Sequence, residues 1–303
     1  MLDIRNIVKR YANHLALDNV SFQIPKGKIV GLLGPNGAGK TSLIRIINQI
    51  TAPDSGEIYF NGEILSPNHI AKIGYLPEER GLYKKMQIGE QMIYLAQLKG
   101  ISKQSAKEKL RYWFEKLEIE SWWDKKVEDL SKGMQQKVQF VATVIHEPEL
   151  IILDEPFSGF DPVNAQIIQD EILELNRKGA TIIYSTHRME SVEALCDYIV
   201  LINHAKLILE GSVKDIKNQY KNQTYTIEYL PKDSNVDLNI QSPKWEIIKH
   251  QQDHAASITL KINSAYSLND VLYELLPQME IQQIFEIIPS MNDIFIDKVT
   301  HKF

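Results

Sequence analysis

Apolar residues near the N-terminus follow two spacings, one typical of strands and one typical of a helix. Residues 28–33 form a short and largely apolar run, which predicts a buried strand. Before it, Val20, Phe22 and Ile24 alternate with polar residues, which predicts a half-exposed strand. Helical spacing follows the run, at Leu43, Ile44, Ile46, Ile47 and Ile50. The sequence therefore predicts strands followed by a helix, with a glycine-rich loop in between.

The alternation of strands and helices continues along the chain. Asn61-Gly62 follows residues 57–60 and signals a hairpin turn, so an antiparallel element accompanies the first strands. The pattern is helical from about 89 to 129. Apolar runs at 150–153 and 181–184 then predict two more strands with a helix between them. This order of elements indicates an α/β fold.

The composition changes near residue 215. All 15 glycines lie at or before Gly211, and Arg188 is the last arginine. We therefore predict a first domain over 1–214 and a small α+β domain over 215–303, which we interpret as a packing or dimer-stabilising appendage. In this small domain we expect strands at 224–230, 245–249, 257–262 and 281–288, and helices at 267–276 and 290–299.

The overall composition excludes several classes of protein. The chain is 44% hydrophobic and 24% charged, as ordinary globular proteins are. Its net charge of −5 gives no general attraction for nucleic acid, so no nucleic-acid partner is expected, although a local basic groove is left open. Cys196 is the one cysteine, so it cannot form an internal disulfide, and we expect it to be buried. No signal peptide or membrane-spanning apolar run is expected, so a membrane role must pass through a partner.

The loop at 34–41 carries the most specific signal. It reads Gly-Pro-Asn-Gly-Ala-Gly-Lys-Thr, a complete G-x-x-x-x-G-K-[ST] phosphate-binding loop between a predicted strand and a predicted helix. Its glycines let backbone N–H groups surround a polyphosphate, Lys40 lies by the β- and γ-phosphates, and the Thr41 hydroxyl can hold Mg²⁺. The helix N-terminus adds a partial positive charge. The predicted nucleotide-binding positions are Gly34, Pro35, Asn36, Gly37, Ala38, Gly39, Lys40, Thr41 and Ser42.

Two acidic residues end the apolar run at 150–153. Asp154 is placed to hold Mg²⁺ through water, and Glu155 is placed to accept a proton from an attacking water molecule. Adjacent carboxylates at the end of a buried strand would repel each other without a cation. The sequence thus predicts a nucleoside triphosphate and Mg²⁺ as ligands.

A third motif, Leu130-Ser131-Lys132-Gly133-Met134, lies between the other two and precedes a predicted helix at 135–145. With the three motifs in this order, residues 1–220 resemble the ATP-binding subunits of ABC transporters. The resemblance implies ATP as the nucleotide. It also implies a P-loop NTPase core of the α/β class, with an antiparallel β-subdomain and a helical subdomain at about 80–130.

The same resemblance implies roles for further residues. Ser131 and Gly133 resemble the signature that binds the γ-phosphate of ATP held by a second subunit. Asp161 resembles a residue of the loop that crosses the seam between the subunits, and His187 resembles the switch histidine that senses the γ-phosphate. Tyr11 resembles the aromatic residue that stacks on adenine. The predicted catalytic residues are Lys40, Glu155 and His187.

The chain departs from the family pattern at two places. Glu78 stands where the family usually has a glutamine that ligates Mg²⁺. The glutamate adds a negative charge, which Arg80 is placed to offset. Lys132 and Met134 depart from the usual signature. Both changes resemble a bacterial subgroup similar to sodium-efflux and drug-efflux ATPases, whose members often carry a small C-terminal domain. The predicted metal ligands are therefore Thr41, Glu78 and Asp154.

The resemblance implies an ATP-hydrolysing subunit that pairs with a second copy and drives a separate integral membrane permease, most simply for export. Such a subunit works in the cytoplasm, on the inner face of the membrane. A soluble ABC-type ATPase acting on ribosomes or DNA is the alternative, but those relatives carry two cassettes or a long coiled coil, and neither is present here. A paralogue that only binds ATP is a third reading, which the retained catalytic residues disfavour.

Overall fold

The computed structural model describes residues 1–79, 81–231, 242–251 and 256–300. The chain forms two compact units, Met1–Val213 and Lys214–Phe303. Each unit has its own cluster of buried apolar side chains. The two units are therefore treated separately below.

A six-stranded sheet forms the centre of the first unit, with strand order β10-β9-β3-β8-β7-β6. All neighbours pair in parallel except β10, which is antiparallel to β9. Every residue of β3, β7 and β8 is buried, so these strands read as apolar runs rather than as alternating patterns. The strands are β3 (Ile29–Leu33), β6 (Ile73–Leu76), β7 (Leu150–Asp154), β8 (Thr181–Ser185), β9 (Tyr198–Asn203) and β10 (Lys206–Ser212).

An antiparallel sheet of order β2-β1-β4-β5 shares a core with the central sheet. Val20, Phe22 and Ile24 point into this core while their neighbours are exposed, as the alternation predicts. Asn61 and Gly62 both have positive φ, 52° and 88°, as the two-residue hairpin turn between β4 and β5 requires. The strands are β1 (Leu2–Tyr11), β2 (His14–Ile24), β4 (Ser55–Phe60) and β5 (Glu63–Ile64).

Helix α1 (Lys40–Ile47) follows β3 and buries its apolar side in the same core. The prediction that Ile50 continues this helix is wrong. The Nδ2 of Asn48 donates to the carbonyl oxygen of Ile44 (2.9 Å), and Gln49 takes a left-handed φ of 56°, which turns the chain away. Ile50 is consequently 60% exposed.

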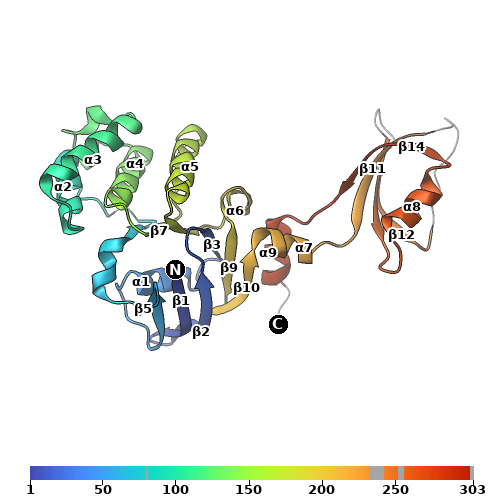
Figure 1. The fold of residues 1–303 in the computed structure, drawn as a ribbon, viewed down its shortest axis with the longest axis horizontal. Coiled ribbons are helices and arrows are strands. Elements are labelled where there is room, and N and C mark those ends of the chain that lie inside the picture. Colours follow the sequence, from blue (N-terminus) through green and yellow to red (C-terminus); the bar gives the residue numbers. More distant parts are fainter. Residues whose placement is uncertain (80, 232–241, 252–255, 301–303) are drawn as a thin grey trace. The chain divides into compact units, whose positions relative to one another are not determined.

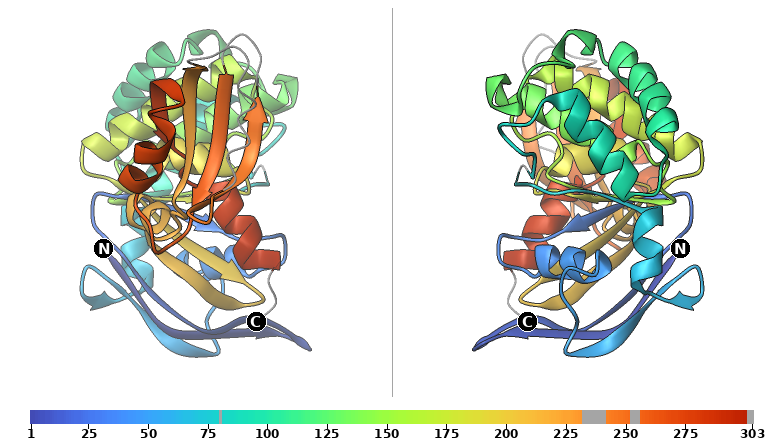
Figure 2. Two further views of the ribbon diagram at one scale, coloured as in Figure 1. Left: turned by 90° about the vertical axis from the view of Figure 1, so that its right-hand side faces the viewer. Right: turned by 90° about the vertical axis from the view of Figure 1, so that its left-hand side faces the viewer.

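The helical segment of the first unit lies on the other side of the parallel strands from the antiparallel sheet (Figures 1 and 2). Aromatic side chains hold it together, with T-shaped contacts between Trp113 and Phe140 and between Phe114 and Trp123. Its helices are α2 (Ile88–Leu98), α3 (Lys103–Lys116), α4 (Lys132–Val144) and α5 (Pro162–Arg177). The unit also contains helix α6 (Met189–Leu195) and three short helical turns, at Pro67–Lys72, Glu120–Trp122 and Val127–Asp129.

The second unit has a four-stranded antiparallel sheet of order β12-β13-β11-β14, and its elements from residue 224 onward follow the predicted order, whereas the helix at Val213–Gln219 was not predicted. Strand β14 begins and ends two residues before the predicted range 281–288. Met279 is fully buried and pairs with Pro231, whereas Ile287 and Ile288 lie exposed beyond the strand. The elements are α7 (Val213–Gln219), β11 (Thr224–Pro231), β12 (Trp245–Gln251), β13 (Ala256–Ile262), α8 (Leu268–Leu275), β14 (Met279–Glu286) and α9 (Met291–Thr300).

Two further expectations concern the cysteine and the membrane. Cys196 is buried, as predicted, and burial raises the pKa of its thiol, which disfavours the reactive thiolate. In the described part of the chain, no helix has both the length and the apolar character needed to cross a membrane.

His146 is a buried histidine next to the C-terminus of α4. Its Nε2 lies 3.2 Å from the carbonyl oxygen of Ile73, while its Nδ1 has no hydrogen-bond partner among the described residues. Lys99 donates to the same carbonyl (2.8 Å). Burial, together with the positive charges of Lys99 and Lys109, lowers the pKa of His146 to about 4.

This lowered pKa predicts a pH-dependent stability. Because an unfolded histidine has a pKa near 6.5, the unfolded chain binds a proton first, and the free energy of unfolding falls as pH drops from about 6.5 towards 4. We expect His146→Gln to remove about 1–2 kcal/mol of the loss between pH 7 and pH 5, as urea titrations would measure. His14→Gln, at an exposed position, serves as the control for the histidine-to-glutamine change itself. An unchanged slope in His146→Gln would contradict this account.

Candidate active site

Four strands bring the predicted motifs to one edge of the central sheet. β3, β6, β7 and β8 run in parallel, so their carboxyl ends lie at the same edge. The phosphate-binding loop follows β3, Glu78 follows β6, Glu155 follows β7, and His187 follows β8. These groups are far apart in sequence, and only the pairing of the strands makes them neighbours.

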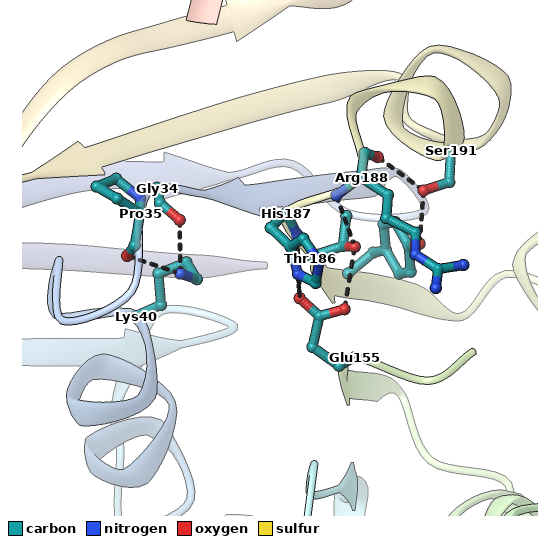
Figure 3. Close-up of polar contacts among 9 residues, drawn as sticks. Gly34, Pro35, Lys40, Glu155, Thr186, His187, Arg188 and Ser191 are labelled. Atoms are coloured by element: carbon teal, nitrogen blue, oxygen red, sulfur yellow. Dashed lines mark hydrogen bonds and ion pairs between the residues drawn. The ribbon is translucent and has the colours of Figure 1, made fainter. Parts of the chain in front are cut away.

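The lysine of the phosphate-binding loop is hydrogen-bonded to the loop's own main chain. The ammonium of Lys40 donates to the carbonyl oxygens of Gly34 (2.7 Å) and Pro35 (3.1 Å), as Figure 3 shows. Helix α1 begins at Lys40, and its N-cap residue Gly39 makes no side-chain capping bond. Because glycine has no side chain, Gly39 cannot cap the backbone N–H groups of the first turn, which suits the binding of an anion there.

The loop needs glycine for two separate reasons. Gly34 (φ 148°) and Gly39 (φ 115°) lie against other strands, where an added Cβ would come within 2.1 Å of the Ile202 carbonyl oxygen and 2.3 Å of the Ala16 carbonyl oxygen. Gly37 has a left-handed φ of 79° but open space around it. The first two glycines thus permit close packing of the loop, while Gly37 is required only by its backbone conformation.

Acidic groups outnumber basic groups next to the loop. Asp154 is only 4% exposed, and burial together with the charges of Glu78 and Glu155 raises the pKa of its carboxyl group. Burial also lowers the pKa of Lys40, and the same three carboxylates oppose that change. Among the residues that the structure describes at this place, three carboxylates therefore act on one ammonium, so a bound cation would stabilise them.

The residues present fit Mg²⁺, which prefers oxygen ligands. Asp154, Glu78 and the Thr41 hydroxyl supply such oxygens at this edge. Among the described residues, no group of three or more metal-ligating side chains is already assembled, so the ion would also need phosphate oxygens or water as ligands. Arg80, predicted to offset the charge of Glu78, lies outside the described residues.

Glu155 and His187 contact each other directly. The Glu155 Oε1 lies 2.7 Å from His187 Nδ1 and accepts the backbone N–H of His187 (3.0 Å), as Figure 3 shows. The Oε2 accepts from the Thr186 hydroxyl (3.2 Å). Glu155 itself has a left-handed φ of 47°, a conformation that costs a side chain about 1–2 kcal/mol. Strain of this kind is typical of functional sites.

Thr186 was not predicted from the sequence, because nothing in the local pattern distinguishes it. Its hydroxyl donates to Glu155 and accepts the backbone N–H of Arg188 (3.1 Å). The Ser191 hydroxyl donates to the Arg188 carbonyl oxygen (2.7 Å) and accepts from Tyr184 (3.0 Å). This chain of hydrogen bonds, visible in Figure 3, fixes the turn that carries His187.

Ser131 and Asp161 act as helix caps within this chain. The Ser131 hydroxyl accepts the backbone N–H of Met134 (3.3 Å), so α4 begins at Lys132 rather than at the predicted residue 135. Asp161 accepts the backbone N–H groups of Val163 and Asn164, both at 3.0 Å, and these bonds hold the pKa of its carboxyl group low.

The two remaining predicted residues lie in different surroundings. An added Cβ on Gly133 would lie 3.2 Å from the Gly159 carbonyl oxygen, so the signature segment packs beside the segment that leads to Asp161. Tyr11 ends β1, is 40% exposed, and has the Lys9 ammonium 5.4 Å from its ring centre. An exposed ring of this kind is available for stacking on a base.

The sequence of the whole chain has a close counterpart. Over 300 residues, it is 39% identical to YhaQ, an ABC transporter ATP-binding protein of Bacillus subtilis (strain 168), and the match covers 99% of this chain and 98% of YhaQ. The chain belongs to the ABC transporter ATP-binding proteins. The resemblance drawn from the ordered motifs is thereby confirmed, and the protein is an ATPase of this family.

Other comparisons agree with this family. The ABC transporter model matches residues 17–158, and the model of the C-terminal domain of DrrA1-3-like ATP-binding proteins matches residues 211–299. The chain is also 35% identical over 219 residues to the linearmycin resistance ATP-binding protein LnrL of Bacillus subtilis (strain 168), covering 71% of this chain and 70% of LnrL. These relatives give no support to the alternative of a ribosome- or DNA-acting ATPase.

A solved structure confirms the fold class. An ATP-binding subunit of an ABC transporter, 31% identical in sequence, superposes with a TM-score of 0.68 over 73% of this chain and 93% of its own. The predicted P-loop core, with its antiparallel and helical subdomains, is therefore the fold of this cassette. The small C-terminal α+β domain is of the DrrA type.

The geometry of the loop predicts unequal effects of two glycine substitutions. Gly34→Ala should lower the free energy of unfolding by more than about 2 kcal/mol, because its Cβ would collide with a backbone carbonyl. Gly37→Ala should lower it by only about 1 kcal/mol, the cost of the left-handed φ. Urea denaturation without nucleotide measures both. Equal losses would show that the loop does not pack as described.

Proposed function

We propose that this cassette hydrolyses ATP at the edge formed by the ends of β3, β6, β7 and β8. The proposal rests on the direct contact between Glu155 and His187. This contact lies on the same edge of the sheet as the phosphate-binding loop, in which Lys40 is hydrogen-bonded to the loop's own carbonyl oxygens. A general base has to lie within reach of the water it activates, and its partner has to hold it there. A residue with a purely structural role would rarely combine a strained backbone with a hydrogen-bonded carboxylate, as Glu155 does at the end of β7.

Residues of the loop bind and orient the nucleotide in this proposal. The backbone of residues 34–42 surrounds the phosphates, and Lys40 leaves its carbonyl partners to meet the β- and γ-phosphates. The N-terminus of α1 adds positive potential at the same place. Tyr11, exposed at the end of β1, stacks on adenine. These contacts position the γ-phosphate for attack, and the Lys40 ammonium also stabilises the negative charge that develops on it.

Glu155 and His187 carry out the proton transfer. The carboxylate of Glu155 accepts a proton from the attacking water as the water oxygen bonds to the γ-phosphorus, and the bond from that phosphorus to the bridging oxygen breaks, so that ADP leaves and inorganic phosphate forms. His187 orients the carboxylate and contacts the γ-phosphate. Thr41, Asp154 and Glu78 would hold Mg²⁺, which when bound offsets negative charge on the phosphate oxygens. The excess of carboxylates over ammonium groups supports this assignment.

A second copy of the chain completes the site. Ser131, Gly133 and Asp161 lie at the starts of α4 and α5, and we propose that they meet the nucleotide bound by the other copy. Helix N-termini of this kind attract the phosphates of a nucleotide. The cassette over 1–214 therefore works as a homodimer, and the domain over 215–303 stabilises it.

The dimer drives an integral membrane permease in this proposal. The helical segment at about 80–130 is the docking surface, and the cassette lies on the cytoplasmic face of the membrane through that contact. Export is the favoured direction, because relatives include a protein named for linearmycin resistance and the C-terminal domain is of the DrrA type. Efflux of a drug or an ion would be consistent with both the named relative and the type of C-terminal domain.

Replacing the base tests the catalytic assignment. Glu155→Gln should keep ATP binding, lower turnover by at least about 100-fold, and accumulate an ATP-bound dimer. Steady-state hydrolysis, nucleotide binding and size-exclusion chromatography measure the three effects. As controls, Glu190→Gln on α6 should behave as the parent protein, and Lys40→Ala should lose ATP binding. Parental turnover in Glu155→Gln would exclude Glu155 as the base.

Purification from the native membrane tests the partner. A tagged cassette should bring down an integral membrane protein in detergent, and ATP with Glu155→Gln should strengthen that association. Recovery of ribosomes or DNA in its place would favour the alternative class and would overturn the transporter assignment.

A further inference from the structure

Helix α4 carries a row of polar side chains on a buried face. Gln136, Gln139 and Thr143 are 2%, 5% and 4% exposed. Their spacing of three and four residues places them on the same side of the helix. The other buried residues of α4 are mostly apolar. Because a buried amide is unfavourable unless it is hydrogen-bonded, two glutamines in this row require an explanation.

Both glutamines contact the main chain beside an acid of the active site. Gln136 Nε2 donates to the carbonyl oxygen of Pro156 (3.1 Å), the residue after Glu155. Gln139 Nε2 donates to the carbonyl oxygen of Pro77 (3.4 Å), the residue before Glu78. One face of one helix is thus connected to the two turns that carry these acids.

Stability does not account for Gln139. Its Oε1 is buried and has no hydrogen-bond partner among the described residues, and its single donor contact is long. An apolar side chain of the same length would remove the unpaired Oε1, and the only hydrogen bond it would give up is the long one to the Pro77 carbonyl oxygen, so the cost in stability is small. The contact with Pro77, rather than the packing, is what an amide provides here.

We propose that Gln136 and Gln139 are positioning residues, which set the main chain at Glu155 and at Glu78 respectively. The inference rests on the proposed function, since it assigns both glutamines to that site. The same helix begins with Ser131 and Gly133. A shift of α4 when those residues meet the nucleotide of the second copy therefore moves the base and a metal ligand together.

Two variants separate the two connections. Gln136→Met should lower kcat for ATP hydrolysis about 10-fold and leave the KM for ATP and the Mg²⁺ requirement within about twofold, since only the base is displaced. Gln139→Met should raise the Mg²⁺ concentration for half-maximal activity about 10-fold and keep kcat at saturating Mg²⁺. Both should melt within a few degrees of the parent protein.

A binding measurement provides a readout independent of turnover. The affinity for Mn²⁺ in the presence of ADP, measured by electron paramagnetic resonance, should weaken about 10-fold in Gln139→Met and stay unchanged in Gln136→Met. Gln23→Met, on the exposed side of β2, is the control for a glutamine-to-methionine change and should match the parent in every assay.

Each outcome decides the matter. If both variants lose stability and activity in parallel, the glutamines are structural and the inference is overturned. Parental kcat in Gln136→Met, or parental Mg²⁺ and Mn²⁺ dependence in Gln139→Met, also overturns it. Failure of the parent protein to hydrolyse ATP would remove the proposed function itself, whereas an active parent with unaffected variants removes only the positioning role.

Discussion

Parallel pairing of β7 with its neighbours β6 and β8 is the constraint on which the site depends. The register aligns Leu76 with Leu153 and Asp154 with Ser185. The segments that follow these strands therefore begin at the same level of the sheet. Glu78, Glu155 and His187 each lie one or two residues beyond that level. A shift of one residue in either pairing would turn each side chain to the opposite face of the sheet and separate the acids from the phosphate-binding loop.

The site combines this rigid frame with locally unfavourable features. Asp154 is buried near two other carboxylates, Glu155 has a left-handed backbone, and the ammonium of Lys40 is partly desolvated and bonded to its own loop. Each feature lowers the stability of the folded chain. A bound nucleotide and cation would stabilise all of them at once, which couples ligand binding to the order of the whole edge.

The second unit follows a different physical scheme. Its antiparallel sheet packs with α8 in a core of its own, and along β13 the buried residues Ile258, Leu260 and Ile262 alternate with less buried ones. The cassette instead buries both faces of its parallel sheet. Each unit therefore has a core formed from its own residues, as independent domains have.

Local spacing was sufficient to predict much of this protein from its sequence. The glycine-rich loop, the apolar runs before it and before Asp154, the hairpin at Asn61-Gly62 and the order of the elements all depend on residues close together in the chain. The ends of helices were harder to predict from the sequence. Ser131 caps α4, which therefore begins three residues before the predicted start, and Asn48 ends α1 before Ile50. These caps depend on single hydrogen bonds that hydrophobic spacing does not report.

Only the tertiary structure decided which residues touch. Glu155 contacts His187 and accepts a hydrogen bond from the Thr186 hydroxyl. Gln136 donates to Pro156, and Gln139 donates to Pro77. The residues in these pairs are 20 to 62 positions apart in the sequence. Distances of this kind are set by strand register and by helix packing against the sheet. The sequence alone therefore determined the chemical groups and the order in which they occur, while the register of neighbouring strands determined the geometry in which they act.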